Sequence, residues 1–91
     1  MYTRTTTVLN KTGLHLRPAA EFVALAGRSV SEITIKRADT TEEALNAKSI
    51  VLLLSMAIAK GTRVEIAAQG EDEKQAVDGL IELIETGFGD L

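Results

Sequence analysis

The sequence predicts a two-layer α+β fold, in which helices cover one face of a β-sheet. Its 91 residues, of which 45% are apolar, suffice for one hydrophobic core but not for two. Two layers are economical at this size, because each element has to bury only one side. Apolar patterns of strand and helix type follow one another in the order β-α-β-β-α-β-α. We therefore expect a single domain over residues 1–91.

The first part of the chain predicts a strand, a helix and a second strand. Tyr2–Val8 is rich in β-branched threonine and is followed at residues 10–13 by turn-forming residues. From Leu16 onward, apolar residues recur at helical spacing as far as Gly27, which can end a helix. Residues 32–36 alternate between polar and apolar, so we expect a strand whose two isoleucines point inward.

The second part predicts two more strands and two more helices. Ala44–Ala47 is expected to form a short strand that returns alongside the second one. Ser49 is a good N-cap for a helix over Ile50–Ala59. Val64–Ala68 alternates like a strand, and residues 71–87 form an amphipathic pattern with acidic residues at its start, where they face the positive end of the helix dipole.

Composition argues against several classes of function. The net charge of −3 and the lack of a basic stripe disfavour binding to nucleic acid or to a lipid surface. The absence of cysteine excludes disulfides and thiolate metal sites and fits a reducing cytoplasm. The longest apolar stretch falls short of the ~20 residues that span a bilayer, and the first residues do not resemble a signal peptide. We expect a monomeric cytoplasmic protein without metal, cofactor or membrane insertion.

The most informative segment is Gly-Leu-His-Leu-Arg-Pro-Ala-Ala at residues 13–20, which places the only histidine just before a helix. The first amides of a helix lack internal partners and lie at the positive end of its dipole, so an anion there is stabilised. The amides of Leu16 and Arg17 are the expected donors. The Arg17 guanidinium can also bind phosphate oxygens through paired hydrogen bonds, and Pro18 stiffens the first turn.

These features make His15 a candidate phosphoryl acceptor. A neutral imidazole nitrogen is a competent nucleophile near neutral pH. Phosphoryl transfer depends mainly on positioning and charge, which the helix end and Arg17 would supply. The alternative is an ordinary surface or capping histidine, which is the commoner role of a lone histidine in this position. One histidine without cysteines or paired carboxylates offers too few ligands for a metal, and no hydrolytic triad or glycine-rich phosphate loop is present.

The predicted helix over 50–59 is apolar on every side. A chain this small cannot cover all of its faces, so some apolar side chains must meet solvent. We interpret this exposed part as a docking surface; the alternative is a helix that is well buried in a small core.

Residues 13–19 resemble the active-site stretch of HPr, the histidine-containing phosphocarrier family of the bacterial phosphoenolpyruvate:sugar phosphotransferase system. Residues 46–50, continuing through Ser55 to residues 59–61, resemble the family's regulatory-serine segment. Residues 85–89 resemble its end, so the similarity covers nearly the whole chain. The resemblance implies an open-faced β-sandwich, with a four-stranded antiparallel sheet covered on one face by three helices.

The resemblance also implies a function and partners. Enzyme I, charged by phosphoenolpyruvate, would phosphorylate His15 at Nδ1, and His15 would pass the group to the enzyme IIA unit of a sugar transporter. The protein would then act as a stoichiometric carrier and not as an enzyme, with Arg17 and the first amides of the helix holding the phosphoryl group. Both partners would dock on the first two helices, and the residues expected at this surface are Leu16, Ala20, Ile50, Val51 and Leu54.

Ser49 aligns with the serine that HPr kinase/phosphorylase modifies in many Gram-positive members of the family. Added charge of about −1.5 to −2 at a helix start is tolerated but would repel an acidic partner. The chain departs from the family at Leu16, where alanine is common, and at residues 51–53, where a Met-Gly-rich run is common. Its acidic connection over residues 37–46 tends toward the nitrogen-related branch.

Three interpretations follow. The first is a phosphocarrier for sugar uptake. The second is a regulatory paralogue, in which Ser49 phosphorylation or the nitrogen-related pathway matters more than sugar flux. The third is an interaction domain without phosphotransfer, which the presence of both His15 and Arg17 disfavours.

Overall fold

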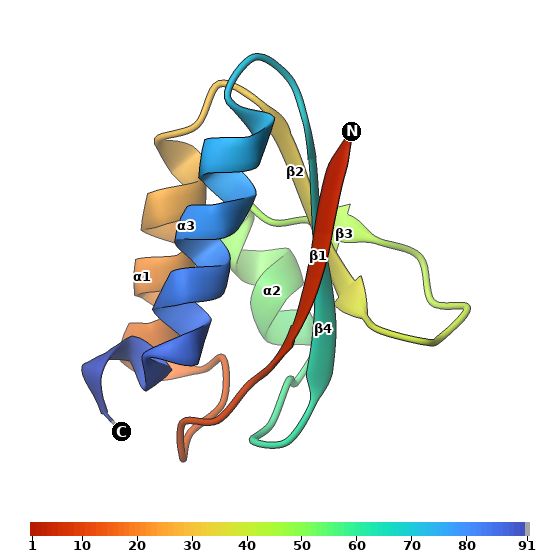
Figure 1. Ribbon diagram of the computed structural model, residues 1–91. Coiled ribbons are helices and arrows are strands. Elements are labelled where there is room, and N and C mark those ends of the chain that lie inside the picture. The colour runs from red at the N-terminus through yellow and green to blue at the C-terminus, as the bar shows by residue number, and fades with distance from the viewer. Residues whose placement is uncertain (91) are drawn as a thin grey trace.

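The computed structural model describes residues 1–90 and has the predicted β-α-β-β-α-β-α order. Three helices lie on one side of the sheet and leave its other side uncovered (Figure 1), which confirms the open-faced α+β architecture. In chain order the elements are β1 (Tyr2–Thr7), α1 (Leu16–Gly27), β2 (Glu32–Arg37), β3 (Leu45–Asn46), α2 (Ile50–Ser55), β4 (Arg63–Gln69), α3 (Glu73–Glu85) and a short 3₁₀ turn, η1 (Gly87–Gly89).

The sheet has four antiparallel strands in the order β1-β4-β2-β3. β4 is central and pairs along its whole length, so that Ile66 lies opposite Arg4 on one side and Ile35 on the other. The predicted alternation is confirmed, because Ile33 and Ile35 are buried beneath the helices while the polar residues between them are not. β3 does return alongside β2, but it is only two residues long.

The core between the sheet and the helices is almost entirely aliphatic, with Phe22 and Phe88 as its only aromatic members among residues 1–90. The buried face of α3 is the one that the helical spacing predicts, and Phe22 of α1 is fully buried beside it. This face consists of Val77, Leu80, Ile81 and Ile84.

The second helix is shorter than the sequence predicts. The apolar run suggested a helix over Ile50–Ala59, but α2 ends at Ser55 and Ala57 adopts a left-handed backbone with a φ of 51°. The turn carries the fully buried side chain of Ile58 into the core. The prediction was wrong here because burial of Ile58 outweighs the local preference to continue the helix. No helix within residues 1–90 has the length and apolar character needed to cross a membrane.

The β1–α1 loop and the α2–β4 turn lie together at one end of the molecule, near the C-terminal turn (Figure 1). The amide of Val8 donates to the carbonyl of Thr62 at 2.9 Å, and the amide of Gly61 donates to the carbonyl of Val8 at 2.7 Å. Further along, the amide of Leu14 donates to the carbonyl of Ile58 at 3.0 Å. The chain leading to His15 is thus built directly on the segment that follows α2.

The opposite end of the molecule is held by Asp72, which precedes α3. Its carboxylate accepts hydrogen bonds from the hydroxyls of Ser29 at 2.7 Å and Ser31 at 2.5 Å. The amide of Ser31 donates to the same carboxylate at 3.2 Å. These bonds, with those from the Val30 amide, hold the pKa of Asp72 below its ordinary value. They join the α1–β2 loop to the β4–α3 loop, far from His15 in the fold.

Candidate functional site

His15 is the N-cap residue of α1. Its backbone is extended, with φ of −132° and ψ of 163°, and its side chain is partly exposed. Within residues 1–90 the imidazole makes no hydrogen bond, to the helix or to another side chain. The loop and turn hydrogen bonds of the described chain do not use the amides of Leu16 and Arg17. A partly exposed imidazole therefore directly precedes the first amides of α1, at the positive end of the helix.

Leu16 has an unusual backbone and an exposed side chain. Its φ of 56° lies in the left-handed region, which is uncommon for a residue with a Cβ atom. Its side chain is 77% exposed, although leucine is normally buried. The left-handed residue at the start of α1 thus follows directly after the extended backbone of His15, and its apolar side chain faces solvent.

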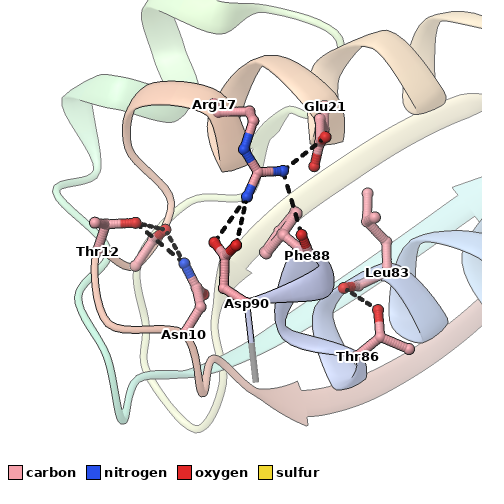
Figure 2. A network of polar contacts seen from close by, with 9 residues as sticks. Asn10, Thr12, Arg17, Glu21, Leu83, Thr86, Phe88 and Asp90 are labelled. Carbon is pink, nitrogen blue, oxygen red and sulfur yellow. Dashed lines mark hydrogen bonds and ion pairs between the residues drawn. The ribbon is translucent and has the colours of Figure 1, made fainter.

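Arg17 is held by acceptors from two parts of the chain (Figure 2). One terminal nitrogen of the guanidinium donates to Glu21 of the same helix at 2.8 Å and to the carbonyl of Phe88 at 3.2 Å. The other donates to both carboxylate oxygens of Asp90, at 2.7 and 2.8 Å. Hydrogen bonding to Glu21 and the charge of Asp90 raise the pKa of Arg17 above its already high ordinary value. The side chain keeps a permanent positive charge.

This arrangement differs from a guanidinium that stands free for phosphate. Both terminal nitrogens of Arg17 are engaged, and Nε has no partner among residues 1–90. A phosphoryl group on a nearby side chain would have to exchange with a carboxylate for these donors. Asp90 was not predicted as a partner of Arg17, because it lies 73 residues away and no local pattern connects the two.

Exposed apolar side chains at the start of α1 and on α2 are together called the apolar patch. In α2 its most exposed member, Val51, is 72% exposed, whereas Leu53 of the same helix is fully buried. The predicted docking residues are all exposed, including Ala20 on α1. Leu52 was missing from that prediction and is 38% exposed. The patch consists of Leu16, Ile50, Val51, Leu52 and Leu54.

Ser49 caps the N-terminus of α2, as the sequence predicts. Its hydroxyl oxygen accepts a hydrogen bond from the amide of Leu52 at 3.2 Å. The side chain is partly exposed and lies directly before the α2 part of the apolar patch. A change of charge at Ser49 would therefore alter the border of this surface without entering the core.

Comparison with known proteins gives a consistent result along the chain. Residues 2–86 match the family described as the PTS HPr component phosphorylation site. The phosphocarrier protein HPr of Pseudomonas putida is 40% identical over 88 residues, which is 97% of this chain and 96% of that protein. The HPr-like protein Crh of Bacillus subtilis is 46% identical over 70 residues, covering 77% of this chain and 79% of the relative.

Solved structures agree with the observed fold. The crystal structure of HPr-C-His from Thermoanaerobacter tengcongensis has a TM-score of 0.93 and 40% sequence identity to this chain. The alignment covers 100% of this chain and 99% of the other. This structural similarity confirms the open-faced β-sandwich that the sequence resemblance to the HPr family implies.

Proposed function

The chain belongs to the HPr family of the phosphotransferase system, and we propose that it carries a phosphoryl group on His15. Its relatives are phosphocarrier proteins, so the general role is that of a carrier. In the proposed cycle, enzyme I donates the group and the enzyme IIA unit of a sugar transporter receives it, in the cytoplasm. The protein is regenerated in each cycle and is not itself the catalyst.

The observation that carries this proposal is the state of the His15 side chain. It is partly exposed and makes no hydrogen bond within residues 1–90. A structural histidine normally uses its ring nitrogens in hydrogen bonds. A ring without partners, beside the free amides of Leu16 and Arg17, fits a nucleophile better than a cap.

In the proposed step, the lone pair of Nδ1 attacks phosphorus, a phosphorus–nitrogen bond forms, and the bond between phosphorus and the donor's nitrogen or oxygen breaks. The reverse exchange then moves the group to the acceptor. The first amides of α1 would stabilise the phosphoryl oxygens, since they lie at the positive end of the helix. Arg17 would add its charge after releasing one of its carboxylate partners.

The apolar patch is proposed as the common docking surface for donor and acceptor. A carrier with a single acceptor side chain has to present that side chain to both partners in turn. Apolar side chains with 38% to 77% exposure offer the contact area that an interface core needs.

The test uses purified enzyme I and labelled phosphoenolpyruvate. We expect wild type to take up an acid-labile label that is absent from His15→Ala and present in Ser49→Ala. Absence of label from wild type would contradict the proposal, as would undiminished label in the His15 variant. Transfer from the labelled protein to a purified enzyme IIA unit tests the second half of the cycle.

A second function is regulation through Ser49. It is supported by the position of this serine at the border of the apolar patch and by the similarity to the HPr-like protein Crh. Phosphorylation of Ser49 by HPr kinase/phosphorylase would place negative charge where partners are proposed to dock. Incubation with that kinase and ATP should then give an acid-stable product that is absent from Ser49→Ala.

A further inference from the structure

We infer that Asn10 is a positioning residue for His15: its buried amide fixes the backbone from which the imidazole projects. This inference rests on the proposed function of His15. In this view the β1–α1 loop not only connects two elements but also fixes the backbone that precedes His15. The loop is defined here as residues 8–14.

The side chain of Asn10 closes the loop from inside. It is 1% exposed, and its Nδ2 donates to the carbonyl of Gly13 at 2.8 Å and to the hydroxyl of Thr12 at 3.2 Å. In return, the amide of Gly13 donates to the carbonyl of Asn10 at 3.1 Å. Two bonds in opposite directions thus join Asn10 and Gly13 and fix the peptide that leads toward His15. Figure 2 shows Asn10 and Thr12 facing each other in this loop.

The closed loop is seated against the segment after α2. Gly13 has a φ of 66°, and a Cβ atom there would collide with the carbonyl oxygen of Ile58 and lie 2.9 Å from Cα of Ala59. The next residue, Leu14, donates its amide to the same Ile58 carbonyl and buries its side chain completely. Only glycine permits this approach, so the position of the loop is defined by contact as well as by hydrogen bonds.

His15 depends on this support because its side chain has none of its own within residues 1–90. One residue, Leu14, separates it from the carbonyl that Asn10 holds. The direction of the imidazole is therefore set mainly by the backbone that enters the helix. A displacement of about 1 Å in a reacting group can cost on the order of a hundredfold in rate. Loss of the Asn10 bond would act on the reaction through this geometry.

The Oδ1 atom of Asn10 shows by contrast that the role of this side chain lies in its Nδ2 group. Its Oδ1 is buried and has no hydrogen-bond partner among residues 1–90. A buried acceptor without a donor is unfavourable, and an apolar side chain would fill the same space without that cost. The two bonds that Nδ2 donates are what the asparagine supplies. Aspartate at this position would have nearly the same shape but would set a carboxylate oxygen against the Gly13 carbonyl.

The experiment compares Asn10→Asp and Asn10→Ala with wild type. The first readout is phosphorylation by enzyme I with labelled phosphoenolpyruvate, and the second is the pair of His15 ring resonances in a proton–nitrogen spectrum of the unphosphorylated protein. We expect both variants to fold, to accept label at least about tenfold more slowly and to shift the ring resonances. Thr12→Val removes the 3.2 Å bond from Asn10 and the long 3.5 Å bond from the Thr12 hydroxyl to the Gly13 carbonyl. It keeps the 2.8 Å bond from Asn10 to that carbonyl, so its rate should stay within about twofold of wild type.

A matched control separates positioning from simple loss of stability. Ser31→Ala removes a bond to Asp72 at the opposite end of the molecule, so it should lower the melting temperature while leaving the rate and the ring resonances unchanged. If the Asn10 variants behave like Ser31→Ala, the inference is overturned. Should Asn10→Asp not fold, Asn10→Ser, whose hydroxyl is too short to reach the Gly13 carbonyl, provides the same comparison.

The two readouts also distinguish this inference from the proposed function. If wild type takes no label from enzyme I, the proposed function fails, whereas the ring resonances still report whether Asn10 positions His15. If wild type is labelled and the Asn10 variants are labelled equally fast with unshifted resonances, only the role of Asn10 fails.

Discussion

Arg17 donates from one guanidinium nitrogen to both carboxylate oxygens of Asp90, a residue from the far end of the chain. This ion pair binds the C-terminal turn to the first turn of α1 and occupies donors that a phosphoryl group on His15 would use. The ion pair is present in the unphosphorylated protein and would have to open if a phosphoryl group on His15 took these donors. Phosphorylation and Asp90 should compete for one cation.

Removal of the Asp90 charge should favour the phosphorylated protein. In Asp90→Asn, Arg17 loses one of its two carboxylate partners and keeps Glu21. The equilibrium constant for phosphorylation by enzyme I, measured from the labelled fraction, should therefore rise about two- to fivefold. Asp78→Asn is the matched control, since it removes an equal charge from an ion pair with Arg4 on the other side of α3. An unchanged or lower labelled fraction in Asp90→Asn would show that the pair does not compete with phosphate.

Loss of Arg17 should impair transfer while the fold is kept. We expect Arg17→Ala to accept label at least about tenfold more slowly, because a charged donor to the phosphoryl oxygens is missing. Arg17→Lys should lie between the two, since it keeps the charge but not the paired geometry. The Arg17 side chain is 52% exposed, and exposed ion pairs contribute little to stability, so the melting temperature should change little. A loss of stability as large as that of a core truncation would indicate a structural role instead.

Alanine substitutions at two neighbouring leucines of α2 should have different effects, one on stability and the other on partner binding. Leu53 is fully buried, so Leu53→Ala should lower the free energy of unfolding by about 2–5 kcal/mol, measured by urea denaturation. Leu54 is 42% exposed, and Leu54→Ala should weaken binding to enzyme I with a much smaller change in stability. Equal affinity of wild type and Leu54→Ala, measured by calorimetry, would remove this residue from the proposed interface.

The hydroxyl of Ser49 should contribute measurably to stability, independently of any modification. Ser49→Ala removes the bond to the Leu52 amide and should cost about 1 kcal/mol of unfolding free energy. Ser49→Asp can cap the helix as well as serine does, so its stability should be close to that of wild type. If the proposed regulation is correct, the same variant should bind enzyme I more weakly. Wild-type affinity in Ser49→Asp would count against a charge switch at this border.

Acid should destabilise the end of the molecule that Asp72 holds. Hydrogen bonds from Ser31 and Ser29 lower the pKa of Asp72 from the ordinary value of 3.8. A lowered pKa in the folded state means that the stabilisation is fully present above the unfolded value and is lost as the pH falls from there through the folded value. The stability difference between wild type and Asp72→Asn should therefore be largest near neutral pH and shrink below about pH 4.

The control for this titration is Asp39→Asn. The Asp39 carboxylate is 86% exposed and lies 3.9 Å from Arg63, and exposed ion pairs contribute little to stability. Asp39→Asn should therefore unfold at nearly the same urea concentration as wild type near neutral pH. A stability difference between wild type and Asp72→Asn that does not change with pH would refute the assigned role of the two serines.

The sequence by itself determined the features that depend on neighbouring residues. Period-two and helical patterns predicted the order of elements and the buried faces of β2 and α3, because side chains that share a face recur at fixed spacing. Ser49 could be identified as a helix cap, since the capping bond spans three residues. The position of His15 before a helix was also predicted correctly, while its role as acceptor remains a proposal.

Only the tertiary structure decided the features that depend on distant contacts. The end of α2 at Ser55 reflects burial of Ile58 in a core made by other elements. Asp90, the long-range partner of Arg17, comes from the other end of the chain. The burial of Asn10 depends on a loop that packs against the turn before β4. Local sequence patterns carry no information about which distant surfaces meet. Local patterns therefore indicated the segment in which the site is proposed, and tertiary packing decided how its charged and polar groups are paired.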